Sequence, residues 1–386
     1  MISLAKNTIP DKTVLDLANW LTSFPRLTKG TLCDEFEKKF SNYIGCKHTI
    51  LVNSGSSANL LVAYALLKAK NLRNKKVIVP SVSWITTLAP FLQLGFEVIL
   101  CDCDRFDLGL DLNHFKKLIE IHDPAVAILV HVLGYPNKMD EITKICDKNK
   151  IYLLEDSCEA LGSKYENTHV GNFGCGGTFS FYYGHHMSTI EGGAVVTNDD
   201  DFADAMKSIR SHGWSRDISD SAKEKWKSYH SIDDVRELYT FYFAGFNLRS
   251  NEISAYLGLK QLDDLPSFVE HRKLVCKWYK EDLPNFYYQK ASSSIVSPFA
   301  YGILVKNRLD VFYELQKNGI ESRPLICGSL GRQPFWINEF GETKHKNADI
   351  VHDYGLYLPI HNSINRKDVE LISSIINQIG IPIFFE

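Results

Sequence analysis

The sequence contains no uninterrupted apolar run that approaches the length of a membrane-spanning helix. Its first six residues lack the hydrophobic segment of a signal peptide. A net charge of −3 over 386 residues provides no electrostatic footprint for nucleic acid or for a membrane surface. The nine cysteines form no CxxC pair, so neither a zinc site nor a redox site is indicated. We therefore expect a cytoplasmic protein with buried thiols, without a bound metal and without nucleic-acid or membrane partners.

A chain of this length with 45% hydrophobic residues can bury one large and one smaller core. Short β-rich runs alternate with helical segments over the first half of the chain, and the runs lie at residues 49–53, 76–79, 97–101, 126–131 and 151–155. This alternation predicts an α/β large domain with a mostly parallel sheet, and ligands bind such sheets at the carboxyl ends of the strands. We place this domain at residues 1–250. Residues 251–386 are expected to form a smaller α+β domain, with strands near residues 293–305.

Several polar or aromatic residues follow the ends of these predicted strands. Gly55 and Ser56 stand between a strand and a strong helix, where free N–H groups and the helix dipole form an anion site, although small residues also simply cap helices. Asp156 closes another strand, where it could equally cap the next helix. Trp84 follows a third strand, and core packing is its alternative role.

The stretch at residues 178–193 carries the most specific pattern of the chain. It predicts a strand at residues 178–182, a tight turn at Gly184, a pair of histidines and an exit through Glu-Gly-Gly into a second strand at residues 194–197. Histidines at a strand end offer groups that change charge near neutral pH. A plain hairpin with two solvated histidines would have the same appearance.

This stretch resembles the Schiff-base segment of the DegT-type nucleotide-sugar aminotransferases, which bind pyridoxal phosphate (PLP). The family pattern is Ser-Phe, three residues, a lysine, five residues and Glu-Gly-Gly. Residues 180–181 and 191–193 match it, but His185 occupies the lysine position. No lysine lies between Lys164 and Lys207, so a shifted register cannot restore one. An imidazole cannot form the covalent link that PLP makes with a primary amine. The chain therefore resembles the subgroup of sugar 3-dehydratases that carry histidine at this position.

The resemblance extends over nearly the whole chain and implies the PLP-dependent aspartate aminotransferase-like fold (fold type I). It also implies which residues hold the cofactor. Gly55 and Ser56 match the turn that binds the phosphate, Trp84 matches the aromatic residue stacked on the ring, and Asp156 matches the carboxylate at the pyridinium nitrogen. The remaining cofactor-binding positions are Ser180 and Asn247. In the family the equivalent asparagine binds the phosphate of the neighbouring subunit, which implies a homodimer with shared active sites.

The resemblance also suggests residues for catalysis and for substrate binding. His185 and Asp156 are expected to be catalytic, together with Glu159, which stands where aminotransferases often carry Gln or His, and with His212 in a polar turn after residue 211. Three arginines are candidates for substrate contacts: Arg216, Arg249 and Arg323. A surface salt bridge is an equal alternative for Arg323, and the turn with His212 could be plain surface.

Together these residues imply a dehydratase that uses PLP and its amine form, pyridoxamine phosphate (PMP). L-glutamate is the expected amino donor, and the expected reaction removes the C3 hydroxyl of a nucleotide-linked 4-keto-6-deoxy sugar such as GDP-4-keto-6-deoxy-D-mannose. No motif distinguishes GDP from CDP or dTDP. An iron–sulfur cluster is not expected, since no cysteine lies between Gly213 and Val275. The alternatives are an aminotransferase that uses another lysine and an inactive binding subunit with the same fold.

Overall fold

The computed structural model describes residues 1–291 and 294–385, and a seven-stranded sheet forms its centre. The strand order is β1-β9-β8-β5-β4-β2-β3. Neighbouring strands are parallel except around β9, which runs antiparallel to both β1 and β8. The bounds are β1 (His48–Val52), β2 (Lys76–Pro80), β3 (Glu97–Cys101), β4 (Val126–Val130), β5 (Tyr152–Asp156), β8 (Gly176–Ser180) and β9 (Gly193–Thr197). The mostly parallel sheet predicted from the sequence is thus confirmed.

Helices cover both faces of this sheet because the strand side chains alternate between two cores. Val77 and Val79 of β2 pack on the side of α3, α4 and α7, whereas Ile78 packs on the side of α5 and α6. A third cluster lies between β1, β8, β9, α2 and α10. These helices are α2 (Thr31–Ile44), α3 (Gly55–Ala69), α4 (Ile85–Gln93), α5 (Leu112–His122), α6 (Met139–Lys148), α7 (Asp200–Arg210) and α10 (Glu252–Leu262).

The C-terminal part builds a second core around a three-stranded sheet of order β11-β13-β12. Ile2 joins this core through hydrogen bonds with Gly319 and Glu321, so the beginning of the chain belongs to it. The sequence predicted strands near residues 293–305, and residue 293 of this range lies outside the described residues. The elements here are α11 (Leu265–Asp282), β10 (Ser294–Ile295), β11 (Tyr301–Leu304), α12 (Arg308–Lys317), β12 (Arg323–Pro324), α13 (Pro334–Phe340), α14 (Lys346–Tyr354), β13 (Gly355–Leu358) and α15 (Arg366–Ile379).

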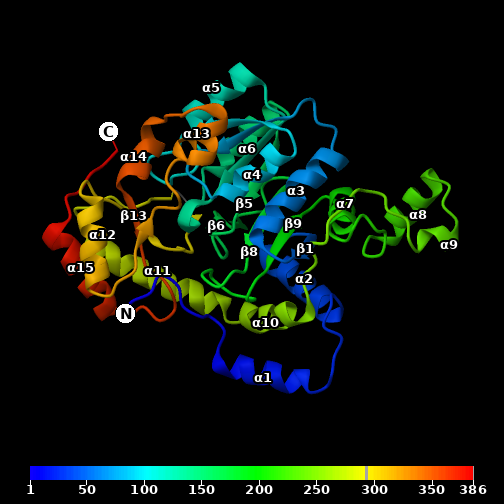
Figure 1. The fold of residues 1–386 in the computed structure, drawn as a ribbon, viewed down its shortest axis with the longest axis horizontal. Helices are drawn as coiled ribbons and strands as arrows, with labels where there is room; N and C mark the ends of the chain where they lie inside the picture. Colours follow the sequence, from blue (N-terminus) through cyan, green and yellow to red (C-terminus); the bar gives the residue numbers. More distant parts are fainter. Residues whose placement is uncertain (292–293, 386) are drawn as a thin grey trace.

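Two segments stand away from the body of the molecule in Figure 1: helix α1 (Asp11–Leu21), and the hairpin of α8 (Asp220–Tyr229) and α9 (Asp234–Glu237). The short strand β6 (Lys164–Tyr165) pairs with β10 on one side and with β7 (Thr168–His169) on the other. Helix α10 packs against α2, although the predicted domain boundary at residue 250 assigns α10 to the smaller domain. That boundary stays a prediction. No helix of the described residues is both long and apolar enough to cross a lipid bilayer.

Candidate active site

A cavity of about 570 Å³ opens at the carboxyl edge of the parallel strands, where the sequence predicted a ligand site. Its wall contains residues that follow β1, β2, β5 and β8, together with residues of the C-terminal part. Eight of the predicted site residues line this one cavity: Gly55, Ser56, Trp84, Asp156, Glu159, Ser180, His185 and Arg323. A volume of this size is typical of small-molecule and cofactor sites.

The N-terminus of α3 forms one end of the cavity. Ser54 caps the helix, because its hydroxyl accepts a hydrogen bond from the Ser57 amide at 3.0 Å. Within the described part of the chain the amide groups of Gly55 and Ser56 donate to no acceptor, so they are available for an anion. A Cβ atom on Gly55 would lie 2.6 Å from the Cβ of Ser180, which requires glycine at this position. This end of the cavity fits a phosphate group.

Asp156 lies at the end of β5 and is held by three hydrogen bonds. One carboxylate oxygen accepts from the Asn59 amide at 2.9 Å and from the Thr87 hydroxyl at 2.7 Å, and the other accepts from the Cys158 backbone amide at 3.1 Å. Only 4% of Asp156 is exposed. A fixed carboxylate of this kind can hold a proton on the ring nitrogen of PLP. Sequence reasoning missed Asn59 and Thr87; the position of Asn59, one turn after Gly55 on α3, was the signal available.

Trp84 stands immediately before α4 with 55% of its surface exposed, and it lines the cavity. A tryptophan in the hydrophobic core would be buried, so the core-packing alternative does not hold. The indole offers a broad apolar face for stacking on an aromatic ring. Its contact with the cofactor remains a prediction.

The two histidines of the central stretch have different environments. His185 lines the cavity, and its ring lies 5.1 Å from the ring of Phe299, centroid to centroid. His186 is fully buried, and its Nε2 lies 3.0 Å from the carbonyl oxygen of Ser297. Burial, with a smaller contribution from the positive charge of Arg272, lowers the pKa of the His185 imidazole to about 4. His185 is therefore a neutral imidazole near pH 7 and can act as a base.

Glu159 follows β5 in the chain and lines the same cavity as His185. Its carboxylate accepts a hydrogen bond from the Leu133 amide at 2.9 Å. Burial raises the pKa of the Glu159 carboxyl to about 8, and the nearby charge of Asp156 acts in the same direction. The site thus combines a neutral base with a protonated acid near neutral pH, which is the pairing that acid–base catalysis requires.

The C-terminal part supplies a wall that the sequence analysis largely missed. Arg323 of β12 is paired in register with Tyr357 of β13, and both line the cavity. Residues 3–5 and Glu321 line it as well, with the Leu4 amide donating to the Glu321 carboxylate at 2.9 Å. These residues come from distant parts of the chain and carry no local pattern. Arg323 is exposed in the cavity and forms no ion pair with a carboxylate of the described residues, which disfavours the surface salt bridge.

The other four predicted residues form a separate cluster next to the base of the α8–α9 hairpin. The guanidinium of Arg249 lies 3.1 Å from the side-chain oxygen of Asn247 and 3.5 Å from Nε2 of His212. The guanidinium of Arg216 lies 4.2 Å from the ring centre of Trp214. None of these four lines the cavity formed by the described residues of this chain. Their roles stay predictions, and that of Asn247 concerns a neighbouring subunit.

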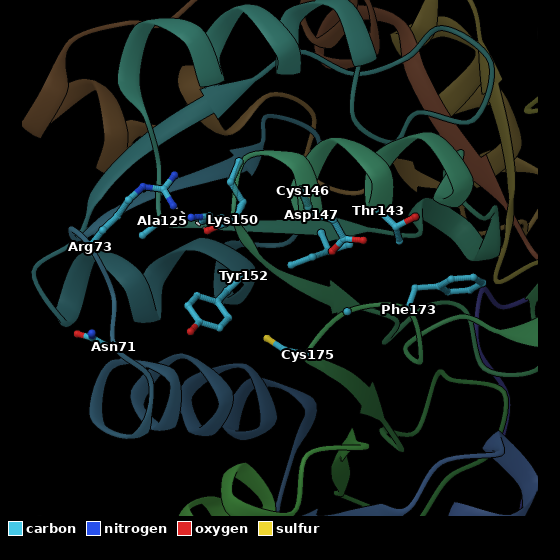
Figure 2. Close-up of a pocket in the computed structure, with 13 residues that line it drawn as sticks. Asn71, Arg73, Ala125, Thr143, Cys146, Asp147, Lys150, Tyr152, Phe173 and Cys175 are labelled. Carbon is cyan, nitrogen blue, oxygen red and sulfur yellow. Dashed lines mark hydrogen bonds between the residues drawn. The ribbon is translucent and has the colours of Figure 1, made fainter.

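A second cavity, of about 590 Å³, lies at the opposite edge of the sheet, where β4 and β5 begin. Figure 2 shows the residues that line it. Arg73, Lys150, Tyr152 and Cys175 are among its lining residues. None of the described residues around it is a predicted site residue. Across the described residues, no group of three or more histidine, cysteine or acidic side chains could hold a metal ion.

Comparison with known proteins agrees with this geometry. Residues 10–377 match the DegT/DnrJ/EryC1/StrS aminotransferase family, and the chain belongs to this family. A relative in Yersinia pseudotuberculosis, GDP-4-keto-6-deoxy-D-mannose 3-dehydratase, is 35% identical over 86% of this chain and 88% of its own length. The E. coli enzyme of the same name, solved with bound hydrated PLP, is 30% identical, with a TM-score of 0.88 over 97% of this chain and 99% of that chain.

A further structure of a GDP-4-keto-6-deoxymannose-3-dehydratase contains a trapped PLP-glutamate geminal diamine; it is 29% identical, with a TM-score of 0.88 over 97% of this chain and 100% of that chain. These matches confirm the predicted family, fold type I and the predicted cofactor. The chain is a PLP-dependent enzyme, and these relatives are 3-dehydratases.

Proposed function

We propose that this enzyme removes the C3 hydroxyl of a nucleotide-linked 4-keto-6-deoxy sugar and releases the 4-keto-3,6-dideoxy sugar. GDP-4-keto-6-deoxy-D-mannose is the proposed substrate, because the Yersinia and E. coli relatives are named as 3-dehydratases of this sugar. L-glutamate is the proposed amino donor, in line with the glutamate adduct in a related structure. The nitrogen that glutamate supplies leaves as ammonia when the product is released by hydrolysis, so no amino group stays on the sugar. One observation carries the proposal: the residues proposed to hold PLP line one cavity together with His185, whose neutral imidazole stands where the family has its lysine.

The protein groups divide the work of holding the cofactor. The N-terminus of α3 binds the phosphate through the amides of Gly55 and Ser56, and Asp156 keeps the ring nitrogen protonated. When bound as PMP, the cofactor supplies a primary amine for the keto sugar and a ring that accepts electrons. Because no lysine of the central stretch can bind the cofactor covalently, PMP is free to remain in its amine form.

Two side chains move protons. The His185 imidazole accepts the proton from C4′ of the cofactor, and as imidazolium it is a strong acid because burial disfavours the charged form. The leaving C3 hydroxyl needs one proton to depart as water. Either the imidazolium or the protonated carboxyl of Glu159 supplies it.

The proposed enzyme is a homodimer with shared active sites. Asn247, Arg249, His212 and Arg216 form a polar cluster outside the cavity of their own chain. The family role of Asn247 lies in the neighbouring subunit, so this cluster is proposed to complete the partner's site and to contact the nucleotide sugar. Arg323 is proposed to bind a carboxylate or a phosphate from within the same chain.

Two other functions fit the residues of this site less well. An aminotransferase needs a lysine that reaches the cofactor, and the described residues that line the cavity include none. An inactive binding subunit would not need the three hydrogen bonds that hold Asp156, nor the close approach of Gly55 to Ser180.

We expect the purified protein to bind PLP reversibly. Borohydride treatment followed by intact mass measurement should show no reduced PLP adduct, and dialysis should remove the cofactor. Addition of glutamate should change the absorption spectrum from that of PLP to that of PMP, and addition of the GDP-4-keto-6-deoxy sugar should yield the 3-deoxy ketone by mass spectrometry. Sedimentation equilibrium should give the mass of a dimer. A reduced adduct on an active-site lysine, or an amino sugar as the product, would show that the enzyme is an aminotransferase.

The pH dependence separates the two proton donors. We expect kcat/KM to fall below a pH of about 4, as His185 becomes protonated, and to fall above a pH of about 8 if the Glu159 carboxyl must carry its proton. Glu159→Gln should then lower kcat by at least about tenfold and remove the alkaline limb. A Glu159→Gln enzyme that keeps both its rate and its alkaline limb would assign the proton on the leaving hydroxyl to His185 alone.

A further inference from the structure

Arg272 of α11 is a buried cation whose position suggests a role beyond packing. Only 1% of its surface is exposed. Its guanidinium donates to the carbonyl oxygens of Ile360 at 2.8 Å, Phe299 at 3.1 Å, Pro298 at 3.2 Å and His185 at 3.4 Å. No carboxylate of the described residues lies within ion-pair distance of it. Carbonyl dipoles alone therefore compensate its charge.

A buried charge without a counter-ion is costly, so it is unusual for simple packing. Arg210 provides the contrast within this chain. It is equally buried, but its guanidinium pairs with the carboxylates of Glu37 and Asp217. Burial lowers the pKa of the Arg272 guanidinium to about 10, so it still carries its charge at neutral pH.

The four carbonyl groups belong to three segments that meet at the guanidinium of Arg272. His185 lies in the loop after β8, Phe299 and Pro298 precede β11, and Ile360 follows β13. The same loop is tied a second time, since Nε2 of His186 lies 3.0 Å from the carbonyl oxygen of Ser297. The ring of Phe299 contacts the rings of both histidines. Arg272 thus joins the histidine loop to the C-terminal part at the cavity wall.

Two cations lie near His185: Arg323 lines the same cavity, and Arg272 is the one whose charge lowers the His185 pKa. His186 and Tyr182 face His185 from its own loop, and Glu159 and Asp156 lie in the cavity. Burial first, and then the Arg272 charge, lower the pKa of both histidines. A cation near the ring disfavours the imidazolium, so it keeps His185 ready as a base and makes the imidazolium a better proton donor.

We propose that Arg272 is a positioning residue for His185: it holds the histidine loop against the C-terminal part at the cavity, and it places a positive charge next to the backbone of His185. Only the expected effect of Arg272 on turnover rests on the proposed function. The contacts of Arg272 and their effect on His185 do not depend on which sugar is the substrate.

The test compares Arg272→Lys, which keeps the charge, with Arg272→Gln, which keeps two hydrogen-bond donors but is neutral. The readout is the titration of the His185 imidazole by NMR in the protein without substrate, with its signal identified by its loss in His185→Asn. Arg272→Gln should raise the proton affinity of His185 by at least about tenfold, and Arg272→Lys should leave it within about threefold. Turnover should fall at least about tenfold in the Gln variant, with partial retention in the Lys variant.

The matched control is Arg210→Gln, which also removes a buried guanidinium but should not move the titration of His185. An unchanged His185 titration in a folded Arg272→Gln variant overturns the inference, whatever the enzyme does with sugars. If neither Arg272 variant folds, the His185 titration of the unsubstituted protein is the test. A His185 that titrates at the ordinary pKa of imidazole there also overturns the inference. If the unsubstituted enzyme forms no 3-deoxy ketone although His185 titrates as expected, the proposed function is refuted and the inference about Arg272 stands.

Discussion

Replacement of Asp156 by asparagine is expected to abolish turnover while the protein still folds. Asparagine has the same shape, and its single amide oxygen can still accept from Asn59 and Thr87, whereas its NH2 group loses the hydrogen bond from the Cys158 amide. However, it carries no negative charge, so it cannot hold a proton on the ring nitrogen of the cofactor. An unprotonated ring accepts electrons poorly. We expect kcat to fall by more than about a hundredfold, equivalent to about 2.7 kcal/mol of transition-state free energy.

The measurement is the rate of 3-deoxy ketone formation by mass spectrometry, with thermal unfolding as the check of folding. Thr87→Val is the matched control. It removes one hydrogen bond to the same carboxylate oxygen but keeps the charge, so kcat should fall by less than about tenfold. If Asp156→Asn retained activity within about tenfold of the parent, the role assigned to Asp156 would be wrong.

The sheet and one side of the site could be predicted because both depend on local patterns. β-rich runs with helical segments between them predict parallel strands, and parallel strands bring their carboxyl ends to one edge. Gly55, Trp84 and Asp156 each follow such a strand, so their meeting in one cavity follows from topology. The spacing between Ser180 and Glu191 added the family pattern, and that pattern identified the cofactor.

The opposite wall could not be predicted, because its residues are brought in by docking of the C-terminal part. Leu4, Phe299 and Tyr357 line the cavity from segments that are far apart in the sequence, and no periodicity links them. The side chains that donate hydrogen bonds to Asp156 could not be predicted for a different reason. Asn59 lies inside a helix and Thr87 inside another, where a polar side chain gives no local sign of the buried partner that it will meet.

The histidine pair shows what each kind of reasoning can decide. As a sequence, His185 and His186 are chemically equal, and only the family spacing selected His185. The structure separates them physically, since one ring faces the cavity and the other is fixed to the Ser297 carbonyl. Arg272 gave no signal at all, because an arginine in an amphipathic helix is ordinarily a surface residue.

His185→Lys is expected to shift the enzyme from dehydration toward transamination. A lysine at this position would lie in the environment that lowers the pKa of the imidazole, namely burial and the positive charge of Arg272. Both effects also lower the pKa of an amine, so the lysine should be largely unprotonated and able to react with PLP. Its amine can then return a proton to the sugar carbon, which gives a 4-amino sugar.

Two measurements are needed in sequence. Borohydride reduction and intact mass should first show a covalent PLP–lysine adduct that survives dialysis, unlike the parent protein. Products from the GDP-4-keto-6-deoxy sugar and glutamate are then identified by mass spectrometry. We expect the 3-deoxy ketone to fall by at least about a hundredfold, since a positioned general acid–base group contributes on that scale, and the amino sugar to appear.

His186→Lys is the matched control, because it places the same side chain one residue further along. The His186 side chain is fully buried against Ser297 and does not line the cavity, so this variant should form no PLP adduct. An adduct in both variants would mean that the loop can turn either side chain toward the cofactor. If the His185→Lys protein forms the adduct but still yields only the 3-deoxy ketone at the parent rate, His185 does not decide the reaction. The choice between dehydration and amination would then rest with Glu159, whose protonated carboxyl lines the same cavity and can donate a proton near neutral pH.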